Sequence, residues 1–295
     1  MNAIETQALT KTIGTVEAVR GLNLRVSDGQ ITGFLGRNGA GKSTTIKMLL
    51  GMVRPSSGSG NVLGRRIDDP SQSLEMRRHV AYVAEDKQLY PYFTVQEMVR
   101  FTRSFYDDWD VNRERLLMDL YELPPKRKVK ALSKGMRTKL ALLLALARNA
   151  KLMILDEPTE GLDPVAIEEM LQSLVAASSR GTTVFFSSHQ IAEVERIADR
   201  ICIIDHGTLV RDVAMESLRD QYRRVTLGFA SDPSPADFVM DGVGTLEVHG
   251  RQLSFCTTSN LEQVLERARQ LEATSVQVDP LGLRDVFLES VKAES

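Results

Sequence analysis

Cysteine is scarce in this chain of 295 residues, where only Cys202 and Cys256 occur and neither belongs to a C-x-x-C pair. A disulfide framework, a metal knuckle and a C-x-x-C redox motif therefore have no support. Two free thiols in a reducing compartment are the simpler interpretation.

Long apolar runs are missing as well. The longest, at residues 140–147, falls far short of the roughly 18 apolar residues that a spanning helix needs. The first residues lack both the basic region and the apolar segment of a secretory signal. We expect a cytoplasmic chain, peripheral on the cytoplasmic face of the membrane if a partner holds it there.

An excess of charge is also absent, because 37 basic residues stand against 39 acidic ones for a net charge of -2. Such a balance gives no bulk attraction to nucleic acid or to anionic lipid, so no nucleic-acid partner is expected. We interpret the short basic run at residues 126–130 as a solvated loop.

What is present is an alternation of short β-rich runs with longer helical patterns over the first two hundred or so residues. Nearly unbroken apolar runs predict strands buried on both faces of a parallel sheet, at residues 30–35, 152–155, 182–187 and 200–204. The sequence thus predicts an α/β body.

Two further regions have a different pattern. Residues 86–150 predict helices only, beginning with a capping box at Thr94 and Glu97. The second of these helices carries Leu116, Leu117, Leu120 and Tyr121 on one predicted side.

Residues 219–295 predict a small α+β domain after the body, which occupies residues 1–218. Its expected elements are strands at 245–248, 252–256 and 275–278 and helices at 260–271 and 283–291.

A phosphate-binding loop is the strongest local motif. The predicted strand at 30–35 leads into a segment that matches G-x-x-x-x-G-K-[ST] and precedes a predicted helix at 45–50. Backbone N–H groups of such a loop and the amino end of the helix bind phosphate, the lysine reaches the β and γ phosphates, and the serine holds Mg²⁺. The candidate residues are Gly36, Asn38, Gly39, Ala40, Gly41, Lys42, Ser43 and Thr44.

A second motif follows the apolar strand at 152–155, which ends in Asp156 and Glu157. After a phosphate loop, this pair predicts one carboxylate that supports Mg²⁺ and one that orients or deprotonates the attacking water. ATP and Mg²⁺ are therefore the expected ligands, although these two motifs alone also suit a kinase, a GTPase or a helicase.

A third motif narrows the class. The segment Leu132 to Met136, followed by an apolar helix at 138–147, resembles the L-S-G-G-Q signature of the ATP-binding-cassette family. Ser133 and Gly135 match, whereas Lys134 replaces a glycine. Ser133 is a good helix cap whose hydroxyl can point at a phosphate.

The resemblance extends to Asp163, in the loop that faces its counterpart across a dimer, and to His189, in the place of the switch histidine. It implies a phosphate-loop NTPase fold with a mainly parallel sheet, an antiparallel N-terminal β part, a helical signature subdomain and a small α+β C-terminal domain. Catalysis would fall to Glu157, His189 and Lys42, and Ser133, Gly135 and Asp163 would join the nucleotide site.

Two positions depart from the family pattern. Glu85 stands where a glutamine usually senses Mg²⁺, so Glu85 joins Ser43 and Asp156 as a candidate metal residue. Ile13 stands where an aromatic ring usually stacks on adenine, which predicts apolar contact without stacking.

The resemblance is closest to single-cassette subunits of exporters whose membrane domains are separate chains. It implies two partners: a second ATP-binding subunit, as a homodimer or close heterodimer, and a separate transmembrane permease. The alternative is a soluble ATPase of the same family with a regulatory role outside transport.

Overall fold

The computed structural model describes residues 2–258 and 260–292. The chain divides after Asp212 into two compact units, unit 1 and unit 2. The predicted domain boundary after Leu218 falls within the helix α8 (Met215–Gln221) of unit 2 and stays a prediction.

Unit 1 contains two sheets. The five-stranded sheet has the order β2-β1-β5-β6, with β3 beside β1, and its pairings are antiparallel. Its strands are β1 (Asn2–Ile13), β2 (Val16–Leu22), β3 (Arg25–Ser27), β5 (Ser57–Val62) and β6 (Arg65–Arg66).

The six-stranded sheet has the order β11-β10-β4-β9-β8-β7, and its strands from β10 to β7 are parallel to their neighbours. Its strands are β4 (Ile31–Leu35), β7 (Val80–Val83), β8 (Leu152–Asp156), β9 (Thr183–Ser188), β10 (Arg200–Asp205) and β11 (Thr208–Ala214). Every residue of β4, β8 and β9 is buried, as expected for strands covered on both faces. The α/β prediction is confirmed, and the four predicted strands lie within one residue of their observed bounds.

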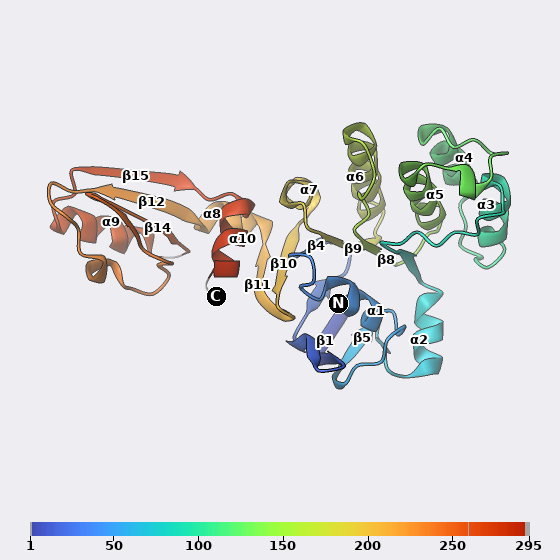
Figure 1. Cartoon of the computed structure of the whole chain (residues 1–295), viewed down its shortest axis with the longest axis horizontal. Helices are drawn as coiled ribbons and strands as arrows, with labels where there is room; N and C mark the ends of the chain where they lie inside the picture. Colours follow the sequence, from blue (N-terminus) through green and yellow to red (C-terminus); the bar gives the residue numbers. More distant parts are fainter. Residues whose placement is uncertain (1, 259, 293–295) are drawn as a thin grey trace. The chain divides into compact units, whose positions relative to one another are not determined.

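Helices cover both faces of the six-stranded sheet (Figure 1). The helix α1 (Lys42–Leu49) contacts β8 on one side and β2 and β5 on the other, so it fills the space between the two sheets. The opposite face is covered by α6 (Pro164–Ser178) and α7 (Ile191–Ile197), which contact β9 and β4. The helix α2 (Pro70–Arg77) contacts β7.

The predicted helical region is a separate group of helices within unit 1 (Figure 1). It comprises α3 (Val95–Arg103), α4 (Val111–Leu120), the short 3₁₀ helix η1 (Val129–Ala131) and α5 (Lys134–Leu146). The capping box of Thr94 and Glu97 is present.

The predicted apolar side of α4 is only partly buried. Leu117 and Tyr121 are buried, whereas Leu116 is 63% exposed and Leu120 is 39% exposed. Leu117 and Tyr121 are four positions apart and share one face, and Leu116 and Leu120 lie on the next face around the helix.

Unit 2 is built on a four-stranded antiparallel sheet of order β13-β14-β12-β15. One face of this sheet packs on α9 through a core that includes Val225, Leu227, Phe255 and Val264. Its elements are α8, β12 (Arg223–Gly228), the 3₁₀ helix η2 (Pro235–Phe238), β13 (Glu247–His249), β14 (Gln252–Thr257), α9 (Leu261–Gln270), β15 (Ser275–Pro280) and α10 (Leu283–Lys292). The elements expected at the sequence level are present, with the first strand of the hairpin shifted toward its turn.

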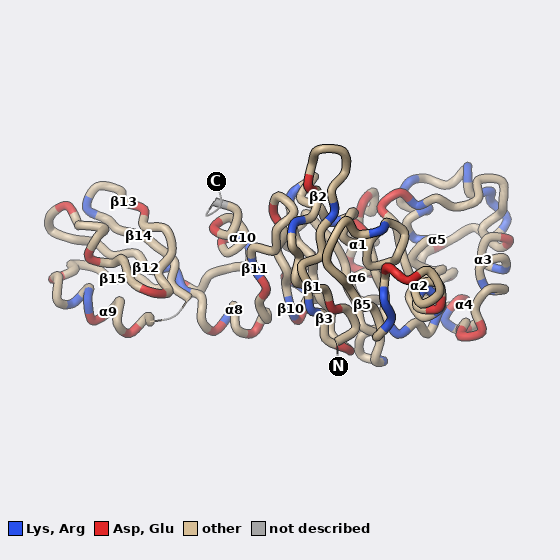
Figure 2. The backbone as a smooth tube through the Cα atoms, turned by 90° about the horizontal axis from the view of Figure 1, so that it is seen from below, with Lys and Arg blue, Asp and Glu red and all other residues tan. Residues whose placement is uncertain are grey.

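Charged side chains of both signs are interspersed along the chain (Figure 2), in keeping with the net charge of -2. Within residues 2–258 and 260–292, no helix combines the length and the apolar character needed to cross a membrane.

Candidate functional site

The phosphate loop joins β4 to α1 at the edge of the parallel sheet formed by the carboxyl ends of its strands. Gly39 and Gly41 have φ angles of 82° and 106°, in the left-handed region that favours glycine. A Cβ atom on Gly41 would lie 2.4 Å from the carbonyl oxygen of Ala18, so no larger residue fits there. The helix begins at Lys42, earlier than the predicted start at Thr45, because Gly41 itself is the N-cap residue that turns the chain into α1.

Lys42 is buried at this edge. Its ammonium group donates to the carbonyl oxygens of Gly36 at 2.8 Å and Arg37 at 3.3 Å. It also lies 3.2 Å from Oε1 of Glu157. With side chains only 6% and 8% exposed, Lys42 and Glu157 form an ion pair shielded from water.

The two carboxylates at the end of β8 are fixed by a serine from the neighbouring strand β9. The Ser187 hydroxyl donates to Oδ1 of Asp156 at 2.6 Å and accepts from the backbone N–H of Glu157 at 3.0 Å. Glu157 has a φ of 46°, which is uncommon for a residue other than glycine. The chain turns sharply here, and the Glu157 side chain reaches Lys42 and His189.

His189 completes this group. Its Nδ1 lies 2.8 Å from Oε2 of Glu157. Because an ionised carboxylate only accepts hydrogen bonds, Nδ1 carries the proton in this pairing. The His189 side chain is 45% exposed, so its ring contacts both the buried Glu157 carboxylate and solvent. We call Lys42, Asp156, Glu157 and His189 the catalytic edge, because catalysis is predicted for Lys42, Glu157 and His189.

The candidate metal residues also meet at this edge. The Ser43 hydroxyl lies 3.4 Å from Oε2 of Glu85. Asp156, Glu85 and Tyr82 line the same groove. Burial, and then the negative charges of Asp156 and Glu85, raise the pKa of Tyr82 to about 12.

One hydroxyl and two carboxylates form an all-oxygen donor set, which suits Mg²⁺. Across residues 2–258 and 260–292 no group of three or more His, Cys, Asp or Glu residues forms a metal cage. Mg²⁺ rarely needs one, since it is commonly held by one or two carboxylates together with substrate phosphates and water. The residues present therefore fit a magnesium ion bound with nucleotide.

Ile13 lies at the tip of the β1–β2 hairpin and is 57% exposed. Its partner across the hairpin is Val16, which is 63% exposed. The hairpin continues through Ala18, whose carbonyl oxygen faces Gly41 of the phosphate loop. Ile13 and Val16 thus form an exposed apolar pair at the tip of a hairpin whose second strand passes the phosphate loop at Ala18.

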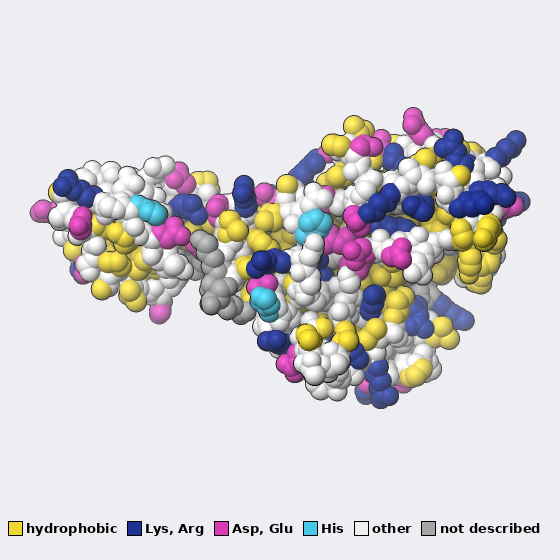
Figure 3. Space-filling view, in the orientation of Figure 1, with side chains coloured by type: hydrophobic (Ala, Val, Ile, Leu, Met, Phe, Trp, Pro, Cys, Tyr) yellow, Lys and Arg dark blue, Asp and Glu magenta, His cyan; other side chains and the backbone are white. Residues whose placement is uncertain are grey.

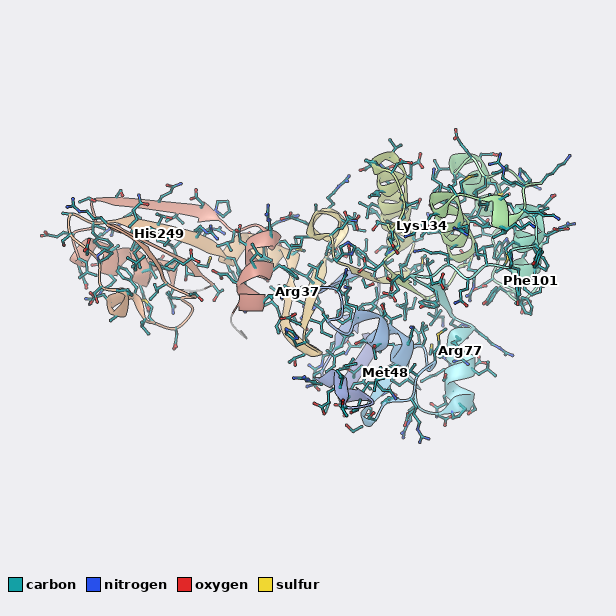
Figure 4. The ribbon with its side chains drawn as sticks, in the orientation of Figure 1. Arg37, Met48, Arg77, Phe101, Lys134 and His249 are labelled. Atoms are coloured by element: carbon teal, nitrogen blue, oxygen red, sulfur yellow. The ribbon has the colours of Figure 1, made fainter. Side chains whose placement is uncertain are left out.

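The remaining candidates, Ser133, Gly135 and Asp163, lie together at a different place. Ser133 caps α5 by accepting from the N–H of Met136 at 3.1 Å, and Asp163 caps α6. All three line a hollow of about 470 Å³ that includes no residue of the phosphate loop. In Figure 4, Lys134 next to Ser133 and Arg37 of the phosphate loop lie well apart.

Several residues that support the catalytic edge had no role predicted from the sequence. One is Ser187. A second is Lys87, whose ammonium donates to the Glu157 carbonyl at 3.2 Å and whose pKa is lowered by burial. A third is Glu193, whose carboxylate accepts from Thr159 at 2.9 Å and Ser188 at 3.0 Å. Ser187 adjoins the predicted His189 motif and Lys87 follows Glu85, but only the fold shows their contacts.

Comparison with known proteins supports the family resemblance that the sequence motifs indicated. The profile of the ABC transporter family matches residues 19–160. The Nod factor export ATP-binding protein I of Rhizobium etli is 33% identical over 98% of this chain and 93% of its own length. The bacitracin transport ATP-binding protein BcrA of Bacillus licheniformis is 34% identical, covering 83% of this chain and 82% of its own.

Solved structures agree on the cassette. An ATP-binding subunit of an ABC transporter superposes with a TM-score of 0.68 at 29% identity, over 74% of this chain and 92% of that one. The dimeric bacterial ABC transporter cassette MJ0796 gives 0.66 at 25% identity, over 72% and 98%. This chain therefore belongs to the ABC transporter family as an ATP-binding subunit that binds ATP with Mg²⁺ and hydrolyses it.

Proposed function

We propose that the chain is the motor subunit of an exporter whose membrane-spanning part is a separate chain, and that two cassettes enclose two ATP molecules between them. One observation carries the proposal. The catalytic edge and the hollow with Ser133, Gly135 and Asp163 occupy separate places, and the hollow contains no phosphate-loop residue. A second cassette can bring its hollow to the first cassette's phosphate loop.

The similarity to named relatives supports export. The Nod factor relative is called an export protein, and the likeness extends over nearly the whole length of both chains. Its range includes unit 2 as well as the cassette, so the two chains share their domain organisation. By analogy with these relatives, the direction proposed for this chain is outward.

The catalytic edge is suited to a controlled hydrolysis. We assign Lys42 to the β and γ phosphates, Glu157 to the attacking water and His189 to the γ phosphate. Lys42 and His189 both contact the Glu157 carboxylate at present. When phosphate takes over the Lys42 ammonium, Glu157 keeps His189 and gains a free oxygen to accept a hydrogen bond from water.

A groove of about 640 Å³ beside the helical group is the proposed site for the membrane subunit. It runs from the end of α1 past Glu85 and Lys87 to α5. Exposed aromatic side chains stand near its rim, with Tyr90 54% and Phe105 65% exposed in an edge-to-face cluster around Phe101. Figure 3 shows hydrophobic side chains gathered at the end of unit 1 where Figure 4 labels Phe101. Such a patch favours a partner surface.

The test is recovery of the tagged chain from the membranes of the cell that encodes it. We expect the chain to co-purify with a protein of several spanning helices. Phe105→Asp, at a position 65% exposed within the aromatic cluster, should reduce the membrane-bound share. Val239→Asp in unit 2, at a position 75% exposed, is the matched control and should not.

If the chain stays in the soluble fraction and hydrolyses ATP at one rate with or without membranes, the proposal fails. The regulatory alternative outside transport would then be preferred.

A further inference from the structure

The feature that carries a further inference is the contact between two loops of unit 1. One is the signature loop, residues 132–136, at the start of α5. The other is the acidic turn, residues 157–163, which runs from Glu157 of the catalytic edge to the cap of α6. The backbones of the two touch, since a Cβ on Gly135 would lie 2.8 Å from the carbonyl oxygen of Gly161.

An ion pair joins these loops at the position where the family resemblance would place a glycine. The Lys134 ammonium lies 2.5 Å from Oε1 of Glu160. The hydrogen bond from Lys134, followed by charge from Lys134, Lys87 and His189, lowers the pKa of Glu160. The carboxylate is therefore ionised at neutral pH and pairs with the Lys134 ammonium.

The stem of Lys134 also packs against the acidic turn. Gly161 has a φ of 82°, and a Cβ there would lie 2.8 Å from Cγ and 2.9 Å from Cδ of Lys134. The lysine thus lies flat across Gly161 before its ammonium reaches Glu160. A glycine at position 134 could provide neither contact.

Two hydrogen bonds to the Glu157 carbonyl oxygen join the acidic turn to the catalytic edge. The N–H of Glu160 donates to the Glu157 carbonyl at 3.3 Å, and Lys87 donates to the same carbonyl at 3.2 Å. Glu160 is therefore in direct hydrogen-bond contact with Glu157. On the signature side, the Thr138 hydroxyl contacts the Glu160 carbonyl at 3.2 Å.

We propose that Lys134 and Glu160 are a positioning pair, which holds the signature loop of this chain against its own acidic turn so that the two move as one body. The pair touches no substrate and acts through Ser133 and Asp163. Its effect on dimer closure rests on the proposed function, because only a second cassette would receive the signature loop.

The pair itself is tested on the nucleotide-free chain by hydrogen exchange. The variants Lys134→Glu and Glu160→Lys should each speed exchange in residues 134–138 and 158–163 by about tenfold, and the double exchange of charges should restore most of the protection. Lys134→Met keeps the stem and should give an intermediate rate.

A matched control comes from Arg196 and Glu168, an ion pair of α7 and α6 with side chains 51% and 40% exposed, against 58% and 40% for Lys134 and Glu160. Reversing the control pair should leave exchange in both loops unchanged. Exposed pairs add little stability, so all these variants should melt within about 3 °C of the parent.

The functional consequence is measured in chains that also carry Glu157→Gln. Each single reversal should weaken Mg-ATP-dependent dimer formation by about tenfold, the double exchange should recover it, and ADP affinity should stay within about twofold. If the chain with Glu157→Gln alone forms no dimer with Mg-ATP, the proposed function fails. The exchange data still test the Lys134–Glu160 pair in that case. Unchanged exchange in the single variants, or no recovery in the double variant, overturns the pairing.

Discussion

The catalytic edge and the signature loop each contain a lysine–glutamate pair, and the two pairs differ in their surroundings. Lys42 and Glu157 are 6% and 8% exposed, whereas Lys134 and Glu160 are 58% and 40% exposed. Charges shielded from water interact strongly and are costly to leave unpaired, while exposed pairs contribute about 0–1 kcal/mol. The first pair is suited to chemistry and the second to adjustable positioning.

The difference extends to the neighbours of each pair. Around Glu157, a strained backbone, the Ser187 hydroxyl and His189 fix the carboxylate from several directions. The Lys134 side chain makes one ion pair, with Glu160, and one packing contact, with Gly161. Substitutions at the catalytic edge should therefore have large effects, and those elsewhere should be modest.

The largest effect is expected for Lys42→Ala, which removes the buried ion pair of Lys42 and Glu157. Loss of the ammonium removes the main charge for the β and γ phosphates and leaves Glu157 buried without its cation. Mg-ATP affinity should fall by about 100-fold or more in titration calorimetry. Lys47→Ala, at an exposed position of the same helix, is the control and should bind as the parent does. Parent-like binding by Lys42→Ala would contradict the assignment.

A smaller effect is expected at the β1–β2 hairpin, which is predicted to contact the base. With Ile13 and Val16 in place of an aromatic ring, affinity should come mainly from the phosphates and Mg²⁺, leaving GTP within about tenfold of ATP. Ile13→Tyr should tighten ATP binding a few-fold by adding a stacking face. Competition of ATP and GTP for a fluorescent nucleotide measures both. A preference of 100-fold or more for ATP in the parent would refute loose base recognition.

The buried carboxylate of Glu193 gives a prediction that depends on pH. Burial raises its pKa above that of the unfolded chain, against the opposing hydrogen bonds from Thr159 and Ser188. As pH rises through the usual carboxyl range toward the raised value, the unfolded chain loses this proton first, so the Glu193 contribution to stability falls.

Glu193→Gln removes that titration and keeps an acceptor for the two hydroxyls. The melting temperature of the variant minus that of the parent should therefore be larger at pH 7.5 than at about pH 4.5. Calorimetric melting of both proteins at both pH values measures this difference. Glu195→Gln, at a half-buried position of the same helix, is the control. A variant that loses relative stability as pH rises would show that the carboxylate is stabilised in its charged form.

The smallest effect is expected from removal of unit 2, and this tests the predicted boundary. A chain that ends after Leu218 should stay folded and bind Mg-ATP within about twofold of the full chain, because every predicted nucleotide residue lies in unit 1. A second chain that ends after Ala214, just before α8, shows whether a broken helix matters. Unfolding or loss of binding in both would place the boundary elsewhere.

Sequence alone predicted the elements whose signals are local. The phosphate loop, the acidic strand end, the capping box at Thr94 and the Ser133 cap each depend on residues that are close along the chain. The start of α1 was missed because Gly41 has a left-handed backbone that only the folded loop requires.

Contacts between distant segments could not be predicted in this way. Ser187 and Asp156 are 31 positions apart, and Lys134 and Glu160 are 26 apart, so neither contact leaves a pattern in the sequence. The exposed Leu116 had the apolar character of a core residue, and only the packing of the helical group decides which face of α4 is covered. The roles of the catalytic-edge residues remain predictions for experiment.

The most direct test of the account is the Glu157→Gln variant, measured for hydrolysis and for dimer formation together. Glutamine keeps the shape of the side chain but cannot take a proton from water, so turnover should fall by roughly 100-fold or more while ATP binding survives. Size-exclusion chromatography with Mg-ATP should then show a dimer that the Lys42→Ala variant does not form. Hydrolysis at the parent rate would contradict the account, and Glu85 would become the next residue to test as the base.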